Sequence, residues 1–110
     1  MTDKMIATTI LNQLGGHVFI AFTGSSKFGV IKNGIKFNIR KNKTRANWMS
    51  ITLTPADTYK VTFTKVTLPK IKKNGEFQEY KEVTIKEFDD IYCDQLQELF
   101  TEVTGLYAHF

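Results

Sequence analysis

The chain has 110 residues, a net charge of +4 and a single cysteine, Cys93. This length fits one domain, residues 1–110, with one hydrophobic core, and it excludes an enzyme built from separate cofactor and substrate domains. A lone cysteine cannot form an internal disulfide, and the longest apolar run, residues 18–22, is too short to cross a bilayer. We therefore expect a cytoplasmic protein without a signal peptide and without membrane contact.

Charge is distributed unevenly along the chain. Residues 1–73 carry 13 Lys and Arg against two acids, whereas residues 74–110 carry two Lys against nine acids. The first part therefore has a net charge of +11 and the second of −7. Such asymmetry indicates either an anionic partner for one face or the docking of two opposite faces on each other.

The N-terminal segment has the pattern of a helix followed by a strand. Ile6, Ile10 and Leu14 recur at helical spacing and predict a helix over residues 3–14. Thr2 or Asp3 can cap its start, and a glycine at position 15 can end it. The next segment, residues 17–23, is apolar at odd and even positions alike, which predicts a strand covered on both sides.

An Asn-Gly pair at positions 33 and 34 predicts the first hairpin, because both central positions of a type I′ turn need a positive φ. Strands are expected at residues 27–32 and 35–40, with Val30 opposite Phe37. This register places one set of apolar side chains on a single face: Phe28, Val30, Ile35, Phe37 and Ile39.

Three further strands are predicted after a basic connection at residues 40–45. Residues 47–54 and 59–68 alternate in polarity, and Trp48 falls on the polar face of the first of these strands. A second Asn-Gly pair, at positions 74 and 75, predicts a ribbon that returns through residues 77–86. In this register Val66 faces Val83 and Lys70 faces Glu79, and Pro69 has to lie at an edge or a bulge.

The last predicted element is a helix over residues 90–104, capped by Asp89 or Asp90 and ended by Gly105. Its buried stripe is expected to comprise Tyr92, Leu96, Leu99, Phe100 and Val103. The expected fold class is α+β. An antiparallel sheet of five or six strands carries the N-terminal and C-terminal helices on the face that bears Phe28, Val30, Phe37 and Ile39.

The residue inventory argues against an enzyme. His17, His109 and Cys93 are the only histidines and the only thiol, and no zinc-binding spacing occurs, so we expect no catalytic residues, metal or cofactor. Cys93 is expected beside the buried stripe as a small apolar residue, with a Cys93/His109 dyad as a minor alternative. Gly15-Gly16 follows a helix and is not expected to open another, which argues against a nucleotide loop.

A basic set of residues is the leading candidate for function: Lys36, Arg40, Lys41, Lys43, Arg45 and Trp48. Lysine and arginine side chains that follow a phosphate backbone, next to an aromatic ring on which a base can stack, are typical of proteins that bind single strands without sequence specificity. The hypothesis is therefore a non-catalytic nucleic-acid-binding protein. The alternative is an ordinary lysine-rich surface, with Trp48 covered by a helix.

An acidic set is the second candidate. Asp94, Glu98 and Glu102 recur every four residues, which predicts one carboxylate face on the C-terminal helix. This face is either simply solvated or a docking surface for a host protein of defence or replication, together with the apolar tail at residues 106–110. An exposed tail or sheet edge would also allow the protein to form a homodimer.

Two stretches resemble a protein family. The sequences ILNQLGGHVFIAFTG at residues 10–24 and YCDQLQELFTEVTGLY at residues 92–107 resemble small uncharacterised proteins encoded by phages and integrative mobile elements of Gram-positive bacteria. The resemblance covers about a third of the chain. It implies a bacterial cytoplasm and an accessory role in the replication, transfer or defence of the element, and it implies no catalytic residues.

Overall fold

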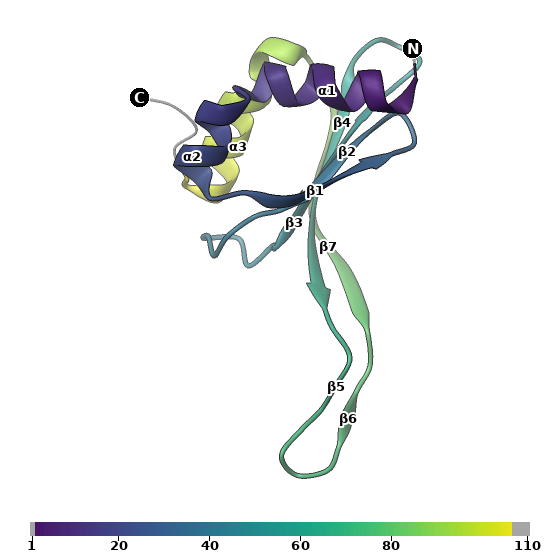
Figure 1. The fold of residues 1–110 in the computed structure, drawn as a ribbon, viewed down its shortest axis with the longest axis vertical. Helices are drawn as coiled ribbons and strands as arrows, with labels where there is room; N and C mark the ends of the chain where they lie inside the picture. The colour runs from purple at the N-terminus through teal and green to yellow at the C-terminus, as the bar shows by residue number, and fades with distance from the viewer. Residues whose placement is uncertain (1, 107–110) are drawn as a thin grey trace.

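The computed structural model describes residues 2–106 and shows an α+β fold (Figure 1). The elements in chain order are α1 (Asp3–Leu14), α2 (His17–Thr23), β1 (Ser26–Ile31), β2 (Gly34–Asn38), β3 (Trp48–Leu53), β4 (Tyr59–Thr67), β5 (Lys70–Ile71), β6 (Phe77–Gln78), β7 (Lys81–Ile91), a 3₁₀ turn (Cys93–Gln95) and α3 (Leu96–Thr104). Five strands form one antiparallel sheet in the order β1-β2-β3-β4-β7, and β5 and β6 form a two-stranded ribbon. The predicted fold class is confirmed.

All three helices cover one face of the sheet, and the core lies between these two layers (Figure 1). Phe19 of α2 meets Phe37 of β2 edge to face, with 5.7 Å between ring centroids, and meets Phe100 of α3 at 4.9 Å. These three rings are fully buried and join two helices to the sheet. No helix among residues 2–106 lies on the opposite face of the sheet, so the side chains of that face are open to a ligand (Figure 1).

The segment after α1 is a second helix, so the predicted strand at residues 17–23 is wrong. Phe19 and Thr23 are both buried, at the i, i+4 spacing of one helix face, and the Thr23 hydroxyl donates to the Phe19 carbonyl at 2.7 Å. Gly15 and Gly16 both have positive φ, and the chain bends by 63° there before the new helix begins. A short apolar run does not separate strand from helix by its period, and here the glycine pair separates two helices.

The first hairpin is confirmed, but its register differs by two residues from the predicted one. Val30 pairs with Ile35, and the loop consists of Lys32 and Asn33, of which only Asn33 has a positive φ. Gly34 lies inside β2 for a steric reason, because a Cβ at this position would stand 2.0 Å from the Ile51 carbonyl oxygen. A shift of two residues leaves every side chain on its predicted face, since strand side chains alternate with period two.

The second ribbon also forms, with a register that differs by one residue. Val66 pairs with Glu82 and Lys70 with Gln78, because the loop at the tip has three residues, 73–75, in place of the predicted two. The Lys72 N–H donates to the Glu76 carbonyl at 2.7 Å and closes this loop. Pro69 falls in the interval between β4 and β5, where a missing N–H removes no ladder hydrogen bond. Beyond β4 the ribbon continues as an arm, defined here as residues 68–80, that projects away from the helices (Figure 1).

The C-terminal helix begins at Leu96, six residues later than predicted. β7 continues to Ile91, which pairs with Tyr59, so Asp89 and Asp90 are strand residues and do not cap the helix. The Gln95 side chain accepts from the Tyr92 N–H at 2.9 Å instead. Of the predicted stripe, Leu96, Phe100 and Val103 are buried and Leu99 is partly buried, whereas Tyr92 is 59% exposed. Gly105 ends the helix in the left-handed conformation, as predicted.

The molecule is elongated, with principal extents of 48 × 31 × 22 Å. Within residues 2–106, no single helix has the length and apolar character needed to cross a membrane. The pair α1 and α2 taken together would be long and apolar enough, but the chain bends by 63° between them.

Candidate nucleic-acid interface

Trp48 lies on the face of the sheet that carries no helix. It occupies the first position of β3, between Asn38 of β2 and Thr64 of β4. Its neighbour Met49 points into the core and is fully buried, so alternation along the strand turns Trp48 to the other side. Trp48 is half-buried and lies on the side of the sheet away from the three helices (Figure 1). The alternative in which a helix covers it is therefore wrong.

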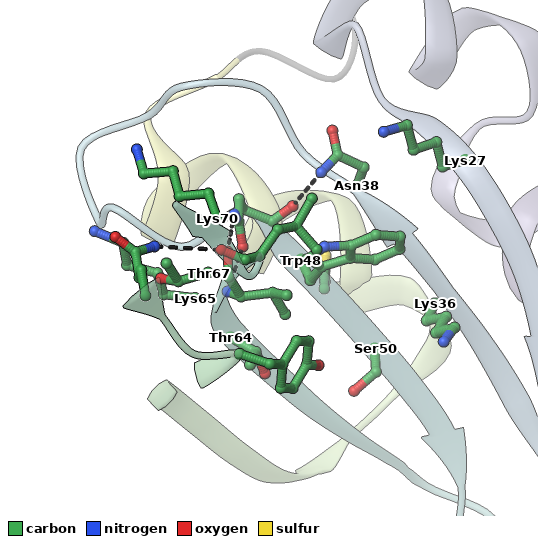
Figure 2. Close-up of a pocket in the computed structure, with 15 residues that line it drawn as sticks. Lys27, Lys36, Asn38, Trp48, Ser50, Thr64, Lys65, Thr67 and Lys70 are labelled. Carbon is green, nitrogen blue, oxygen red and sulfur yellow. Dashed lines mark hydrogen bonds between the residues drawn. The ribbon is translucent and has the colours of Figure 1, made fainter. Parts of the chain in front are cut away.

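A groove of about 670 Å³ lies over Trp48 (Figure 2). Figure 2 shows Lys27 and Lys36 on one side of the indole and Lys65 and Lys70 on the other. None of the residues that line the groove is acidic. Lysine residues thus lie on both sides of the aromatic ring, and no carboxylate among the described lining residues is there to neutralise them.

The wall on the far side of Trp48 is made by the end of β4 and by the arm. Leu68, Lys70, Gln78 and Tyr80 of the arm all line the groove, and Tyr80 adds a second aromatic ring. Tyr80 donates a hydrogen bond to Glu82 at 3.1 Å. Desolvation, and next this hydrogen bond, raise the pKa of Tyr80 from its ordinary value.

Asn47 fixes the angle between the floor and this wall. β3 begins at Trp48, so Val66 of β4 has no backbone partner on that side. The Asn47 amide replaces it, accepting from the Val66 N–H at 2.7 Å and donating to the Val66 carbonyl at 2.8 Å. The Asn38 side chain in turn donates to the Asn47 carbonyl at 2.9 Å. The side chains of Asn47 and Asn38 therefore continue the hydrogen bonding of the sheet by one residue beyond the start of β3, at the edge of the groove.

Lys36 contacts Trp48 directly. Its ammonium nitrogen lies 5.7 Å from the centroid of the indole ring, within the range of a cation–π interaction. Lys27 reaches the groove from an irregularity in β1, where its own φ is 55°. Bulges of this kind occur where a strand has to re-aim a side chain.

The remaining members of the predicted basic set do not line the groove. Arg40, Lys41, Lys43 and Arg45 lie in the loop between β2 and β3, with exposed side chains. A Cβ on Gly24 would come within 3.1 Å of the Arg40 side chain, and the Lys43 N–H donates to the Thr104 carbonyl at 3.3 Å. Arg40 and Lys43 therefore lie beside the ends of α2 and α3, so the structure brings together only Lys36 and Trp48 of the set.

The sequence did not single out Lys27, Lys65, Lys70 or Tyr80. Each of them reaches the groove only because β1 joins one edge of β2 and because β4 continues beyond the start of β3. Two signals were available. The predicted hairpin places Lys27 on the same polar face as Lys36, and the predicted strand at residues 59–68 is longer than the one at residues 47–54.

The acidic set is exposed but only partly helical. Glu98 and Glu102 lie one turn apart on α3, whereas Asp94 belongs to the preceding 3₁₀ turn. The two glutamates border a small hollow of about 170 Å³ with Ile91 and Leu99. Of the predicted apolar tail, Leu106 packs against the core, and residues 107–110 lie outside the described part of the chain.

Cys93 is exposed, so its predicted place beside a buried stripe is wrong. It borders a hollow of about 370 Å³ that Tyr59 and Gln13 also line. Tyr59 donates to Gln13 at 2.7 Å, and burial raises the pKa of its phenol above 10.0. His109, the other member of the minor dyad, lies outside the described residues. Across residues 2–106, no three His, Cys, Asp or Glu side chains gather as a metal site.

Comparison of the chain with models of known protein families, with curated proteins and with solved structures finds no match. The groove and its side chains are therefore the basis for a functional assignment.

Proposed function

We propose that this protein is a non-catalytic nucleic-acid-binding protein that takes up a single strand, without sequence specificity, in the groove over Trp48. The observation that carries the proposal is the half-buried indole flanked by four lysines in a lining without acidic residues. The resemblance of residues 10–24 and 92–107 to small proteins of phages and mobile elements supports an accessory role in the cytoplasm of a bacterial host.

The lysines supply the affinity. Each ammonium group that neutralises a phosphate releases condensed counterions, which makes binding favourable and dependent on salt. Lys27 and Lys36 on one side of the indole, and Lys65 and Lys70 on the other, can follow a backbone that crosses the groove. The loop residues Arg40, Lys41, Lys43 and Arg45 extend the positive surface toward the helices and attract the same polyanion at longer range.

The aromatic rings supply the preference for a single strand. A base stacks on an indole only when its own face is free, and in a duplex that face is covered by the neighbouring base pair. The ring of Trp48 lies at the floor of the groove, so an unpaired base has to enter the groove to reach it. Stacking of this kind contributes about 1–3 kcal/mol for each base and tolerates any sequence.

The first test uses labelled single-stranded and duplex oligonucleotides of mixed sequence, titrated by fluorescence anisotropy at two salt concentrations. Trp48 is the only tryptophan, so its intrinsic fluorescence reports stacking independently of the label. We expect the single strand to bind more tightly and to quench the indole, and Trp48→Ala to weaken binding while Trp48→Phe retains most of it. Absence of binding at low salt would contradict the proposal.

Two sets of charge variants separate the groove from the loop. Lys36→Gln with Lys65→Gln and Lys70→Gln should lower the salt slope by about 0.7 for each phosphate that is no longer neutralised. Arg40→Gln with Lys43→Gln and Arg45→Gln should weaken binding less, and Lys32→Gln at the hairpin loop is the control for a change of net charge. A larger loss of affinity from the loop set would move the interface to the loop.

The alternative function, a protein-binding role in which the protein inhibits or recruits a host factor, uses Asp94, Glu98 and Glu102. It predicts that Glu98→Ala with Glu102→Ala abolishes capture of a host protein and leaves oligonucleotide binding unchanged. The small hollow between these glutamates and Leu99 is the only feature among the described residues that favours it.

A further inference from the structure

The indole of Trp48 already has a partner in the free protein. The ammonium nitrogen of Lys36 lies over the ring, 5.7 Å from its centroid. Trp48 and Lys36 project from the same face of neighbouring strands, since Lys36 is two positions away from Asn38, the residue that pairs with Trp48. Lys36 is exposed and lines the groove, so its ammonium covers the ring from the groove side.

The sheet makes room for Lys36 in this position. Gly29 of β1 pairs with Lys36, and a Cβ at Gly29 would stand 3.7 Å from the Lys36 Cε and 3.8 Å from its Cγ. The stem of the lysine therefore runs over a position that has no side chain. Within residues 2–106 the ammonium forms no ion pair, and the electron-rich face of the indole takes the place of a carboxylate.

A base that stacks on Trp48 needs the space that Lys36 occupies. Stacked rings are in van der Waals contact, about 3.5–4 Å apart, so a base on this face and an ammonium over the same ring exclude each other. Stacking therefore requires the Lys36 side chain to move off the ring. The flexible stem of a lysine permits this movement, and a phosphate of the bound strand offers the displaced ammonium a charged partner.

We propose that Lys36 determines the specificity of the groove, because it covers Trp48 until a strand that carries phosphates draws it away. This role rests on the proposed function, and it narrows the ligand to a base linked to a phosphate. Such a ligand gives Lys36 a new partner in place of the one that stacking removes. A flat aromatic molecule without a phosphate gives none and has to compete with the ammonium for the ring.

The experiment compares two single strands of the same mixed sequence, one with ordinary phosphodiester links and one with uncharged methylphosphonate links. Lys36→Ala should bind the phosphodiester strand severalfold more weakly than the unmodified chain, because it loses a phosphate contact. The same variant should bind the methylphosphonate strand about two- to fivefold more tightly, the size of an exposed cation–π contact, because the ring is uncovered. Quenching of Trp48, the only tryptophan, measures both affinities.

Lys27→Ala is the matched control, since Lys27 lies on the same side of the indole (Figure 2), whereas the ammonium over the ring is that of Lys36. It should weaken binding of the phosphodiester strand and leave the methylphosphonate strand unchanged. Lys36→Arg keeps a cation over the ring and should bind both strands like the unmodified chain. If Lys36→Ala shifts the two affinities in the same direction, or does not bind the methylphosphonate strand, Lys36 is an ordinary phosphate contact and the proposed role is wrong.

Proton NMR follows the lysine itself. In the free protein the ring current of Trp48 should shift the Lys36 Hε protons upfield, and Trp48→Leu should remove this shift. The phosphodiester strand should move these protons away from their position in the free protein. A strand that binds and quenches Trp48 while these protons stay in place contradicts only the role of Lys36. Absence of binding by the unmodified chain would overturn the proposed function and this role with it.

Discussion

Gly34 lies in the middle of three strands, at a position where there is no room for a side chain. It pairs with Ile31 of β1 on one side and with Thr52 of β3 on the other, and a Cβ at this position would overlap the Ile51 carbonyl oxygen at 2.0 Å. The Asn33-Gly34 sequence predicted the hairpin correctly but for a different reason. The residue with the positive φ is Asn33, and Gly34 is needed for the close approach of two backbones.

Gly34→Ala should therefore destabilise the protein strongly, by about 3 kcal/mol, since a backbone atom cannot move aside as a flexible side chain can. Urea denaturation followed by circular dichroism measures this change in stability. Gly29→Ala is the matched control in the neighbouring strand. A Cβ there meets only the Lys36 side chain, at an ordinary contact distance of 3.7 Å, and little change in stability is expected. Equal effects of the two substitutions would contradict the steric account.

Among the helices and strands, those predicted correctly are those whose residues carry local signals. α1 has a helical apolar stripe, a Thr2 cap that accepts from the Met5 N–H at 3.2 Å, and a terminal glycine. α2 is seven residues long, which is too short for a period to show, and its sequence suits a strand as well as a helix. α3 begins late because pairing between β7 and β4 extends to Ile91 and takes up the two aspartates that resemble a cap.

The residues of the groove divide in the same way, into those that a local sequence pattern indicates and those that only the arrangement of the strands brings there. Lys36 and Trp48 could be predicted because alternation along single strands places both on the polar face. The predicted hairpin also places Lys27 on the face of Lys36, although Lys27 was not counted in the basic set. Lys65, Lys70 and Tyr80 could not be predicted, since their positions depend on which strands are neighbours and on how far β4 extends beyond β3. The loop residues Arg40 and Lys43 were grouped with them by sequence proximity alone, and the loop carries them toward the helices.

The clamp made by Asn47 gives a prediction at the scale of these elements. Asn47→Ala removes two hydrogen bonds to Val66 and leaves its N–H and carbonyl without their side-chain partner, which should cost about 1–3 kcal/mol of stability. The wall of the groove then loses its fixed angle to Trp48, and oligonucleotide affinity should fall severalfold.

Asn47→Asp tests the same clamp more finely, because it can still accept from the Val66 N–H but cannot donate to the carbonyl. Denaturation measures its effect on stability. Oligonucleotide affinity, measured by anisotropy, should fall more than for Asn47→Ala, because the substitution also adds a carboxylate to the lining of the groove. Asn12→Ala, at an exposed position on α1, is the control. If Asn47→Ala binds oligonucleotide as tightly as the unmodified chain, the hydrogen bonds from Asn47 to Val66 do not contribute to oligonucleotide binding.

For the molecule as a whole, the uneven charge of the sequence is partly balanced by strand pairing. β4 belongs to the basic part of the chain and β7 to the acidic part, and the two lie side by side along the sheet. Lys60 and Glu87 form an ion pair across them at 3.1 Å, and the hydrogen bond that the Lys60 ammonium donates to this carboxylate raises the pKa of Lys60. The lysines that line the groove, by contrast, have no acidic residue beside them in the lining.

The two-stranded ribbon of the arm has a thermodynamic consequence for the groove. Lys70 and Gln78 face the groove, while Ile71 and Phe77 lie on the other face of the same two strands. A ribbon with no layer on either face is marginally stable in water, so a nucleic-acid strand that contacts Lys70 and Gln78 should order it.

Saturating single-stranded oligonucleotide should therefore slow amide hydrogen exchange at residues 70–78 of the arm. Exchange measured with and without oligonucleotide checks this, and unchanged exchange would show that the bound strand does not contact the arm. The measured affinity of the groove then includes the free energy needed to order the arm, so a variant that stabilises the ribbon should bind more tightly without any new contact to nucleic acid.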